Sequence, residues 1–190
     1  ANRGTCFGAM GDHERAIADY DQAIRHAPSN AIAYYNRGNS YRILGQHQRA
    51  ITDFDEATRL NPSFLGAHFY RGLSYAALKQ YQRAIADFDV VLRLDPTIAL
   101  AYAFRGGCYL ELRQLERALA DYNEAIRLDP TNAPRYYDRG NVYDHLGQPN
   151  RAITDFDEAI RLDPTYLNAY FDRGSSHASL GRFEQALADF

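Results

Sequence analysis

Residues 31–64 read AIAYYNRGNSYRILGQHQRAITDFDEATRLNPSF, and the chain repeats this pattern from one end to the other. A proline recurs every 34 residues, at Pro28, Pro62, Pro96, Pro130 and Pro164. A glycine keeps the same spacing, at Gly4, Gly38, Gly72, Gly106, Gly140 and Gly174. With Gly38 as position 8 of the unit, the complete units are 31–64, 65–98, 99–132 and 133–166, and the partial ones are 1–30 and 167–190. A fixed period of this length is the signature of a repeat protein.

Each unit is expected to form two helices. Its apolar residues follow a 3.6-residue period in two blocks, 31–44 and 48–60 in the unit quoted above, and strands would require alternation instead. Gly45 lies just past the first block, where a left-handed residue ends a helix cheaply. Asn61 precedes Pro62, and this pair ends the second helix. Because the units at both ends are truncated, we expect the chain to be a piece of a longer protein.

The helix pairs are expected to stack. One pair cannot cover its own apolar face, so successive pairs pile up into an all-α solenoid, and we predict a single repeat domain over residues 1–190. Lys79 and Arg113 stand where other units have the glycine equivalent to Gly45. These two turns are therefore expected to be strained or differently shaped.

The pattern resembles the tetratricopeptide repeat family. The matching residues of the second unit are Tyr34, Gly38, Tyr41, Gly45, Ala50, Phe54, Ala57 and Pro62. The resemblance covers the whole chain and implies a right-handed superhelix of antiparallel helix pairs, with the first helices lining a concave surface. It also implies a scaffold that binds peptide segments or other proteins, without indicating which ones.

One departure from the family recurs in every unit. Position 7, usually leucine, is arginine, at Arg3, Arg37, Arg71, Arg105, Arg139 and Arg173. Position 23 is aspartate, at Asp19, Asp53, Asp87, Asp121, Asp155 and Asp189. Position 7 lies within the apolar stripe of the first helix, where a guanidinium without a carboxylate costs several kcal/mol. We expect each arginine to pair with the aspartate of its own or of the preceding unit.

Pairing along one helix is the alternative for these aspartates. An arginine at position 19 would then pair with the aspartate at position 23. The second helices also carry an acid at position 25, such as Asp55. We expect this acid on a solvated face, supported by Arg59 four residues later.

The inner wall of the first helices holds the candidate binding residues. Positions 2, 5, 9, 12 and 13 lie opposite the packing stripe, with position 6 at its margin, and aromatic rings there are typical of surfaces that anchor a partner. Alternatively, part of each ring fills space between adjacent first helices. By resemblance, Asn39 and Asn141 are expected to contact the backbone of a bound peptide. The candidate ligand-binding residues are Tyr35, Asn36, Asn39, Arg42, Phe69, Tyr70, Phe104, Glu111, Tyr137, Asp138, Asn141, His145 and Phe171.

The charges on this wall differ between its ends. The second unit carries Arg42, whereas acids gather around His145 in units four to six. These acids are Glu111, Asp138, Asp144 and Asp172. We therefore expect the partner, a protein or peptide segment, to place basic residues against the C-terminal half. The alternative is ordinary surface charge.

Other functions are disfavoured by composition. The formal net charge is −3, which gives no field for nucleic acid or an anionic membrane, and no run of 18 apolar residues could span a bilayer. The histidines show no metal-ligand spacing, and no nucleophile recurs with a base and an orienting group, so we expect no metal, no cofactor and no enzymatic activity. Cys6 and Cys108 lie three units apart, too far for a disulfide, which favours a reducing compartment such as the cytoplasm.

The sequence therefore predicts a protein-interaction scaffold. Two alternatives stay open. The truncated ends could associate with those of other copies, because terminal units normally carry a polar cap. The array could also be the targeting arm of a catalytic domain outside this chain.

Overall fold

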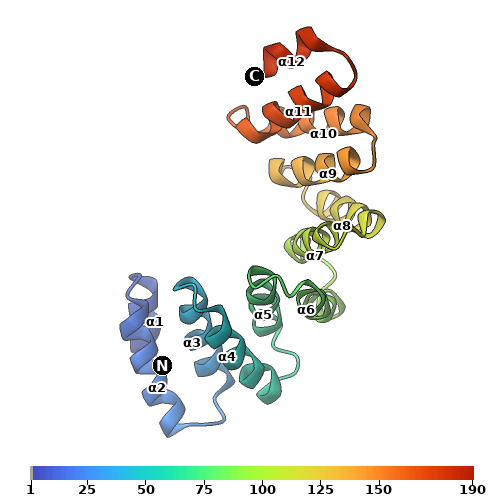
Figure 1. Ribbon diagram of the computed structural model, residues 1–190. Coiled ribbons are helices and arrows are strands. Elements are labelled where there is room, and N and C mark those ends of the chain that lie inside the picture. The colour runs from blue at the N-terminus through green and yellow to red at the C-terminus, as the bar shows by residue number, and fades with distance from the viewer. Residues whose placement is uncertain (1) are drawn as a thin grey trace. The chain divides into compact units, whose positions relative to one another are not determined.

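The computed structural model describes residues 2–190, and all regular structure in that range is helical (Figure 1). The helices are α1 (Asn2–Ala9), α2 (His13–His26), α3 (Ala31–Ile43), α4 (His47–Leu60), α5 (Leu65–Ala77), α6 (Tyr81–Leu94), α7 (Ala99–Glu111), α8 (Leu115–Leu128), α9 (Ala133–His145), α10 (Pro149–Leu162), α11 (Leu167–Ser179) and α12 (Phe183–Asp189). They fall where the repeat predicts them and confirm an all-α repeat solenoid.

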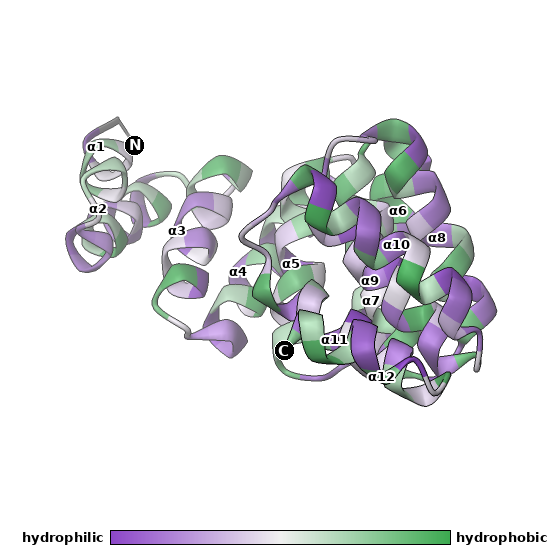
Figure 2. Cartoon of the chain, turned by 90° about the horizontal axis from the view of Figure 1, so that it is seen from above, coloured by the Kyte–Doolittle hydropathy of each residue, from purple (hydrophilic) through white to green (hydrophobic). Residues whose placement is uncertain are grey.

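The chain forms two compact units, Ala1–Pro96 with α1 to α6 and Thr97–Phe190 with α7 to α12. Within each unit the two helices of a repeat pack against each other, and the second helix packs against the first helix of the next repeat. Hydrophobic and hydrophilic residues are interspersed along the helices (Figure 2). The prediction of a single domain over residues 1–190 stays a prediction.

The turn inside each repeat passes through left-handed backbone. Gly45 has a φ of 73°, and the glycines at the equivalent turns are similar. Lys79 and Arg113 adopt the same conformation, each with a φ of 58°. A residue with a Cβ pays about 1 kcal/mol there, so the prediction of two strained turns is confirmed.

Small residues let the two helices of a repeat approach closely around a buried ring. Phe54, Phe88 and Phe156 are fully buried. The glycine at position 8 faces this ring, and a Cβ placed on Gly38 would lie 3.0 Å from Cε1 of Phe54. At Gly140 the space is tighter still, with 2.6 Å from an added Cβ to Cε1 of Phe156. The invariant glycine therefore reflects close packing.

The arginine at position 7 pairs with the aspartate of its own repeat. Arg37 donates from Nε and Nη2 to the two carboxylate oxygens of Asp53, at 2.8 and 2.6 Å. The hydrogen bond to Asp53 holds the pKa of the Arg37 guanidinium above its usual value. The other pairs are Arg3–Asp19, Arg71–Asp87, Arg105–Asp121, Arg139–Asp155 and Arg173–Asp189. Pairing within the repeat, one of the two expected arrangements, is confirmed.

The acid at position 25 links neighbouring repeats, which the sequence analysis did not anticipate. Arg71 donates from Nη1 to Oδ1 of Asp55 in the preceding repeat at 2.8 Å. The expected pairing of Asp55 with Arg59 was wrong, because Arg59 donates to Glu56 at 2.7 Å instead. The same link joins Arg37 to Asp21, Arg173 to Asp157 and Arg139 to Asn123. Each of these guanidinium groups therefore contacts the second helices of two successive repeats.

Candidate functional site

In the N-terminal unit, α3 and α5 bring five of the predicted residues together. The rings of Tyr35 and Tyr70 lie 6.0 Å apart between centroids, and Phe69 lies 5.5 Å from Tyr70. The Arg42 guanidinium lies 4.7 Å from the centre of the Tyr70 ring, a cation–π contact. It also donates from Nε and Nη2 to Oδ1 of Asn39 at 3.1 and 3.0 Å. We call these residues the N-terminal wall.

Several rings of the N-terminal wall also pack inside the unit. Tyr35 lies 4.7 Å from Phe64 and 6.2 Å from Phe54 between ring centroids. Burial raises the pKa of the Tyr35 hydroxyl. Phe69 lies 5.9 Å from the buried Phe88. These rings therefore pack against α4, α6 and the loop before α5, and their role in binding stays a prediction.

Asn36, the sixth predicted residue of this unit, forms a hydrogen bond within α3 through its backbone. Its carbonyl accepts a hydrogen bond from Oγ of Ser40 at 3.1 Å. The residue is half-buried. Its role in binding stays a prediction, as does the role of Asn39 toward a peptide backbone.

In the C-terminal unit, the predicted residues lie on α7, α9 and α11. The Tyr137 hydroxyl on α9 donates to Oδ2 of Asp172 on α11 at 2.8 Å. Burial raises the pKa of Tyr137, and a hydrogen bond with Asn141 opposes that rise. Asp144 accepts a hydrogen bond from Oγ of Ser176, which lies 2.9 Å from both of its carboxylate oxygens. The structure therefore joins α9 and α11 through side chains that the sequence analysis assigned to binding.

The acids of this unit are not equivalent. Asp138 is half-buried, and burial raises the pKa of its carboxyl group to about 6. No described residue donates a hydrogen bond to it or forms an ion pair with it, whereas Asp144 and Asp172 each accept one. Glu111 is exposed at the end of α7. Among the acids of α9 and α11, Asp138 stands apart as the one without a donor.

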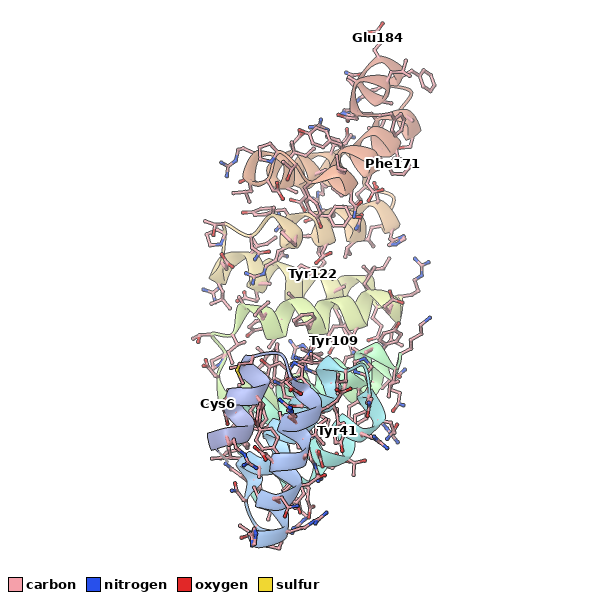
Figure 3. The ribbon with its side chains drawn as sticks, turned by 90° about the vertical axis from the view of Figure 1, so that its left-hand side faces the viewer. Cys6, Tyr41, Tyr109, Tyr122, Phe171 and Glu184 are labelled. Carbon is pink, nitrogen blue, oxygen red and sulfur yellow. The ribbon has the colours of Figure 1, made fainter. Side chains whose placement is uncertain are left out.

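The remaining predicted residues are more exposed. Phe171, labelled in Figure 3, is 63% exposed. Its ring lies 5.5 Å from that of Phe190 between centroids. Phe104 is 41% exposed. His145 lies near a cation, since Nη1 of Arg113 is 3.2 Å from its Nδ1. We call the predicted residues of this unit, together with Asp144 and Asp172, the C-terminal wall.

One ring beside each wall was not predicted from the sequence. Tyr166 lies 5.0 Å from Tyr137 between ring centroids, just as Phe64 lies 4.7 Å from Tyr35. Both occupy the last position of their unit, in the loop before the next first helix. An aromatic at the same position of two units was the available signal.

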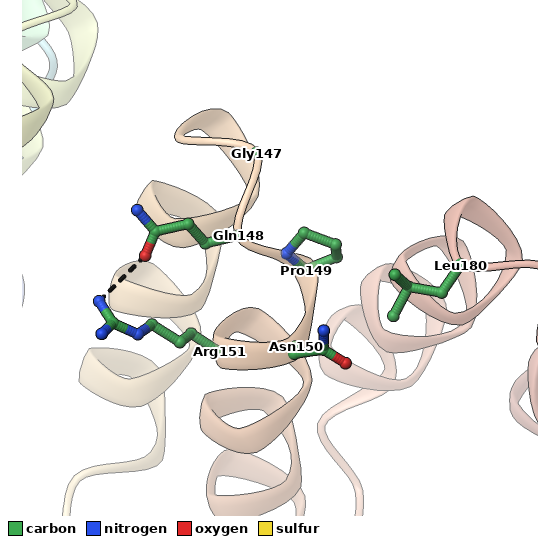
Figure 4. Close-up of a pocket in the computed structure, with 6 residues that line it drawn as sticks. All are labelled: Gly147, Gln148, Pro149, Asn150, Arg151 and Leu180. Carbon is green, nitrogen blue, oxygen red and sulfur yellow. Dashed lines mark hydrogen bonds between the residues drawn. The ribbon is translucent and has the colours of Figure 1, made fainter.

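Two similar surface depressions occur at the turns, and a third, of about 420 Å³, is lined in part by Asp144 and Ser176. One, of about 570 Å³, is lined by Gly147, Gln148, Pro149, Asn150, Arg151 and Leu180 (Figure 4). Arg151 donates to Oε1 of Gln148 there at 3.0 Å. An equivalent depression of about 490 Å³ is lined by Gly45, Gln46, His47, Gln48, Arg49 and Leu78. Its recurrence at the same repeat positions makes it a property of the repeat and not a dedicated site.

Within residues 2–190, no three His, Cys, Asp or Glu side chains are grouped so that they could hold a metal ion. In the same range no helix is both long enough and apolar enough to cross a bilayer. Cys6 is exposed and Cys108 is buried, and both are free thiols. Burial raises the pKa of the Cys108 thiol to about 11, which leaves it protonated and unreactive at neutral pH.

Residues 2–63, 38–99 and 71–133 match one tetratricopeptide repeat (TPR) family, and residues 106–169 match a second tetratricopeptide repeat family. The chain belongs to the tetratricopeptide repeat proteins. Among curated proteins, none matches the chain.

Solved structures of other TPR proteins share this fold. MamA from Desulfovibrio magneticus RS-1, as the fragment from residue 41 to its end, is 25% identical with a TM-score of 0.83, over 87% of this chain and 93% of that one. YrrB, a TPR protein with an unusual peptide-binding site, is 24% identical with a TM-score of 0.76, over 90% and 88%. A TPR protein from Parabacteroides merdae is 20% identical with a TM-score of 0.86, over 99% and 75%.

Proposed function

We propose that this TPR chain is a protein-interaction scaffold that binds a segment of its partner on the walls formed by its first helices. The observation that carries the proposal is the N-terminal wall. There, half-buried rings from α3 and α5 adjoin a guanidinium and an amide. Rings that are held in place on one side and accessible on the other bind a partner at low entropic cost.

The test compares the chain with a variant in which Tyr35, Phe69 and Tyr137 are alanine. The variant should lose the partners that the unaltered chain retains in an affinity pull-down. A matched control replaces Thr52 and Thr154, exposed residues of the second helices, with alanine, and should keep the partners. Far-UV circular dichroism verifies that each variant is folded. Partners retained equally by all three proteins would move the binding surface to the second helices or the loops.

The charge of the C-terminal wall refines the proposal. Its acids favour a segment with basic residues at this end, because complementary potentials steer and orient association. Changing Asp138 and Asp144 to Asn should weaken the binding of cationic segments, most clearly at low salt. Unchanged affinity at both low and moderate salt would contradict this refinement.

A further inference from the structure

Asp138 lacks the hydrogen bond that its counterpart in the next repeat has. Asp172 occupies the same repeat position and accepts from the hydroxyl of Tyr137, which lies at position 5 of the preceding repeat. For Asp138 the corresponding residue is Ala103, which has no donor. The carboxylate is half-buried, and a partly desolvated anion without a donor is costly. The sequence of α7 thus leaves this acid unpaired.

A second polar group beside it is also without a partner. Tyr122 on α8 is 2% exposed, and its hydroxyl forms no hydrogen bond with any described residue. In the first repeat the equivalent hydroxyl, of Tyr20, donates to Oγ1 of Thr5 at 3.4 Å. Gly107 stands at the position of Thr5, and a Cβ placed there would be 3.5 Å from the Tyr122 hydroxyl. The glycine therefore removes the partner and opens space in front of the hydroxyl.

The two groups lie at adjacent places in the fold, because the rings at the equivalent repeat positions, Phe54 and Tyr70, are 6.4 Å apart between centroids. The charge of Asp138 helps to raise the pKa of both Tyr122 and Tyr166, after burial as the main cause. Burial alone raises the pKa of Asp138. The neighbouring Arg139 is engaged with Asp155 and Asn123. Among the described residues, no cation therefore pairs with Asp138.

We infer that Gly107, Tyr122 and Asp138 form a subsite for one cationic side chain, lysine or arginine, of the bound segment. The inference rests on the proposed function, because it assigns a residue type to a partner held on the C-terminal wall. The side chain donates to the Asp138 carboxylate, and the Tyr122 hydroxyl oxygen accepts a further hydrogen bond. A long side chain brings its charge to a half-buried carboxylate while its backbone stays outside.

A metal ion does not fit the same place. A calcium site takes most of its six to eight oxygen ligands from the protein, and magnesium is held by carboxylates together with several waters and substrate phosphates. No group of three candidate ligands exists among residues 2–190. An ammonium or guanidinium group, in contrast, is satisfied by one carboxylate and one hydroxyl, with water on its remaining donors.

The test selects binders from a displayed library of random decapeptides and compares three proteins. The unaltered chain and Glu116→Gln should enrich lysine or arginine at one peptide position, and Asp138→Asn should not. Glu116→Gln is the matched control, since it removes one negative charge from the same unit at an exposed residue of α8 outside the C-terminal wall. A selected peptide should bind Asp138→Asn with an affinity lower by about tenfold or more. Enrichment that survives in Asp138→Asn, or binders without basic residues, overturns the inference and leaves the proposed function standing.

A second measurement separates the two failures. Titration with n-butylguanidinium, followed by the backbone amide signals of the folded chain, should shift Gly107 in the unaltered chain and not in Asp138→Asn. If no decapeptide is selected but this shift occurs, the proposed function fails and the subsite stands. If Gly107 does not shift and no binder carries a basic residue, the subsite is refuted.

Discussion

Removing the carboxylate of Asp53 should destabilise the chain far more than removing that of Glu56, three residues along the same helix. Asp53 is 3% exposed and accepts two hydrogen bonds from Arg37. Breaking a buried ion pair costs about 3–5 kcal/mol, because the partner charge stays behind. In Asp53→Ala, Arg37 keeps its contact with Asp21 at 2.5 Å. The expected loss of stability is therefore near the lower end of this range, about 3 kcal/mol.

Glu56→Ala is the matched control. Glu56 pairs with Arg59 through side chains that are 36% and 65% exposed. Exposed pairs of this kind contribute less than about 1 kcal/mol. Both variants lose one negative charge from α4, so the difference between them isolates burial and geometry from net charge.

Urea denaturation followed by far-UV circular dichroism measures the free energy of unfolding of both variants. Because repeat arrays can unfold in parts, amide hydrogen exchange of α4 gives the local value independently. Exchange should accelerate in α3 and α4 for Asp53→Ala and change little for Glu56→Ala. Equal losses of stability in the two variants would refute the idea that a partly desolvated guanidinium depends on this carboxylate.

Three further predictions concern packing, protonation and backbone strain. Gly140→Ala should lower the melting temperature and destabilise the chain by about 1–3 kcal/mol, because the new Cβ would lie 2.6 Å from the ring of Phe156. Gly106→Ala should destabilise it less, because its nearest neighbour, Cβ of Asp121, would be 3.3 Å away; equal losses in the two variants would contradict this. Burial raises the pKa of Asp138 from 3.8 to about 6, so between these pH values the folded chain keeps a proton that the unfolded chain releases, and the free energy of unfolding falls by up to about 3 kcal/mol as the pH rises. Asp138→Asn should remove this pH dependence; the same pH dependence in the variant and the unaltered chain, measured by urea denaturation, would argue against it. Lys79→Gly should stabilise the chain by about 0.5–1 kcal/mol in thermal unfolding, since glycine adopts a φ of 58° without strain, and a loss of stability would show that the turn is unstrained.

The period predicted the helices, the strained turns and the arginine pairs, because these depend on residues within one repeat. Arg37 needed an acid inside its own helix pair, and Asp53 was the acid at a constant position. The link from Arg71 back to Asp55 was missed, since the angular position of a residue on one helix does not show which helix of the next repeat faces it.

The candidate site was harder to predict for the same reason. Tyr35 stays a predicted residue of the inner wall, and its contact with Phe64 depends on a loop residue that follows no helical period. The difference between Asp138 and Asp172 depends on position 5 of the preceding repeat, Ala103 in one case and Tyr137 in the other. Reading each position against the neighbouring repeat would have revealed it.

Arg37 stands midway in the chain between its two carboxylates, Asp21 and Asp53, each 16 residues away. Duplication or deletion of a whole 34-residue segment therefore preserves both bonds at every junction, wherever the cut falls. A gene encoding such an array can lengthen or shorten by unequal recombination without stranding a charge, whereas an insertion that is not a multiple of the period would break one. The number of repeats can therefore change in evolution, whereas the 34-residue spacing between them is constrained by these ion pairs.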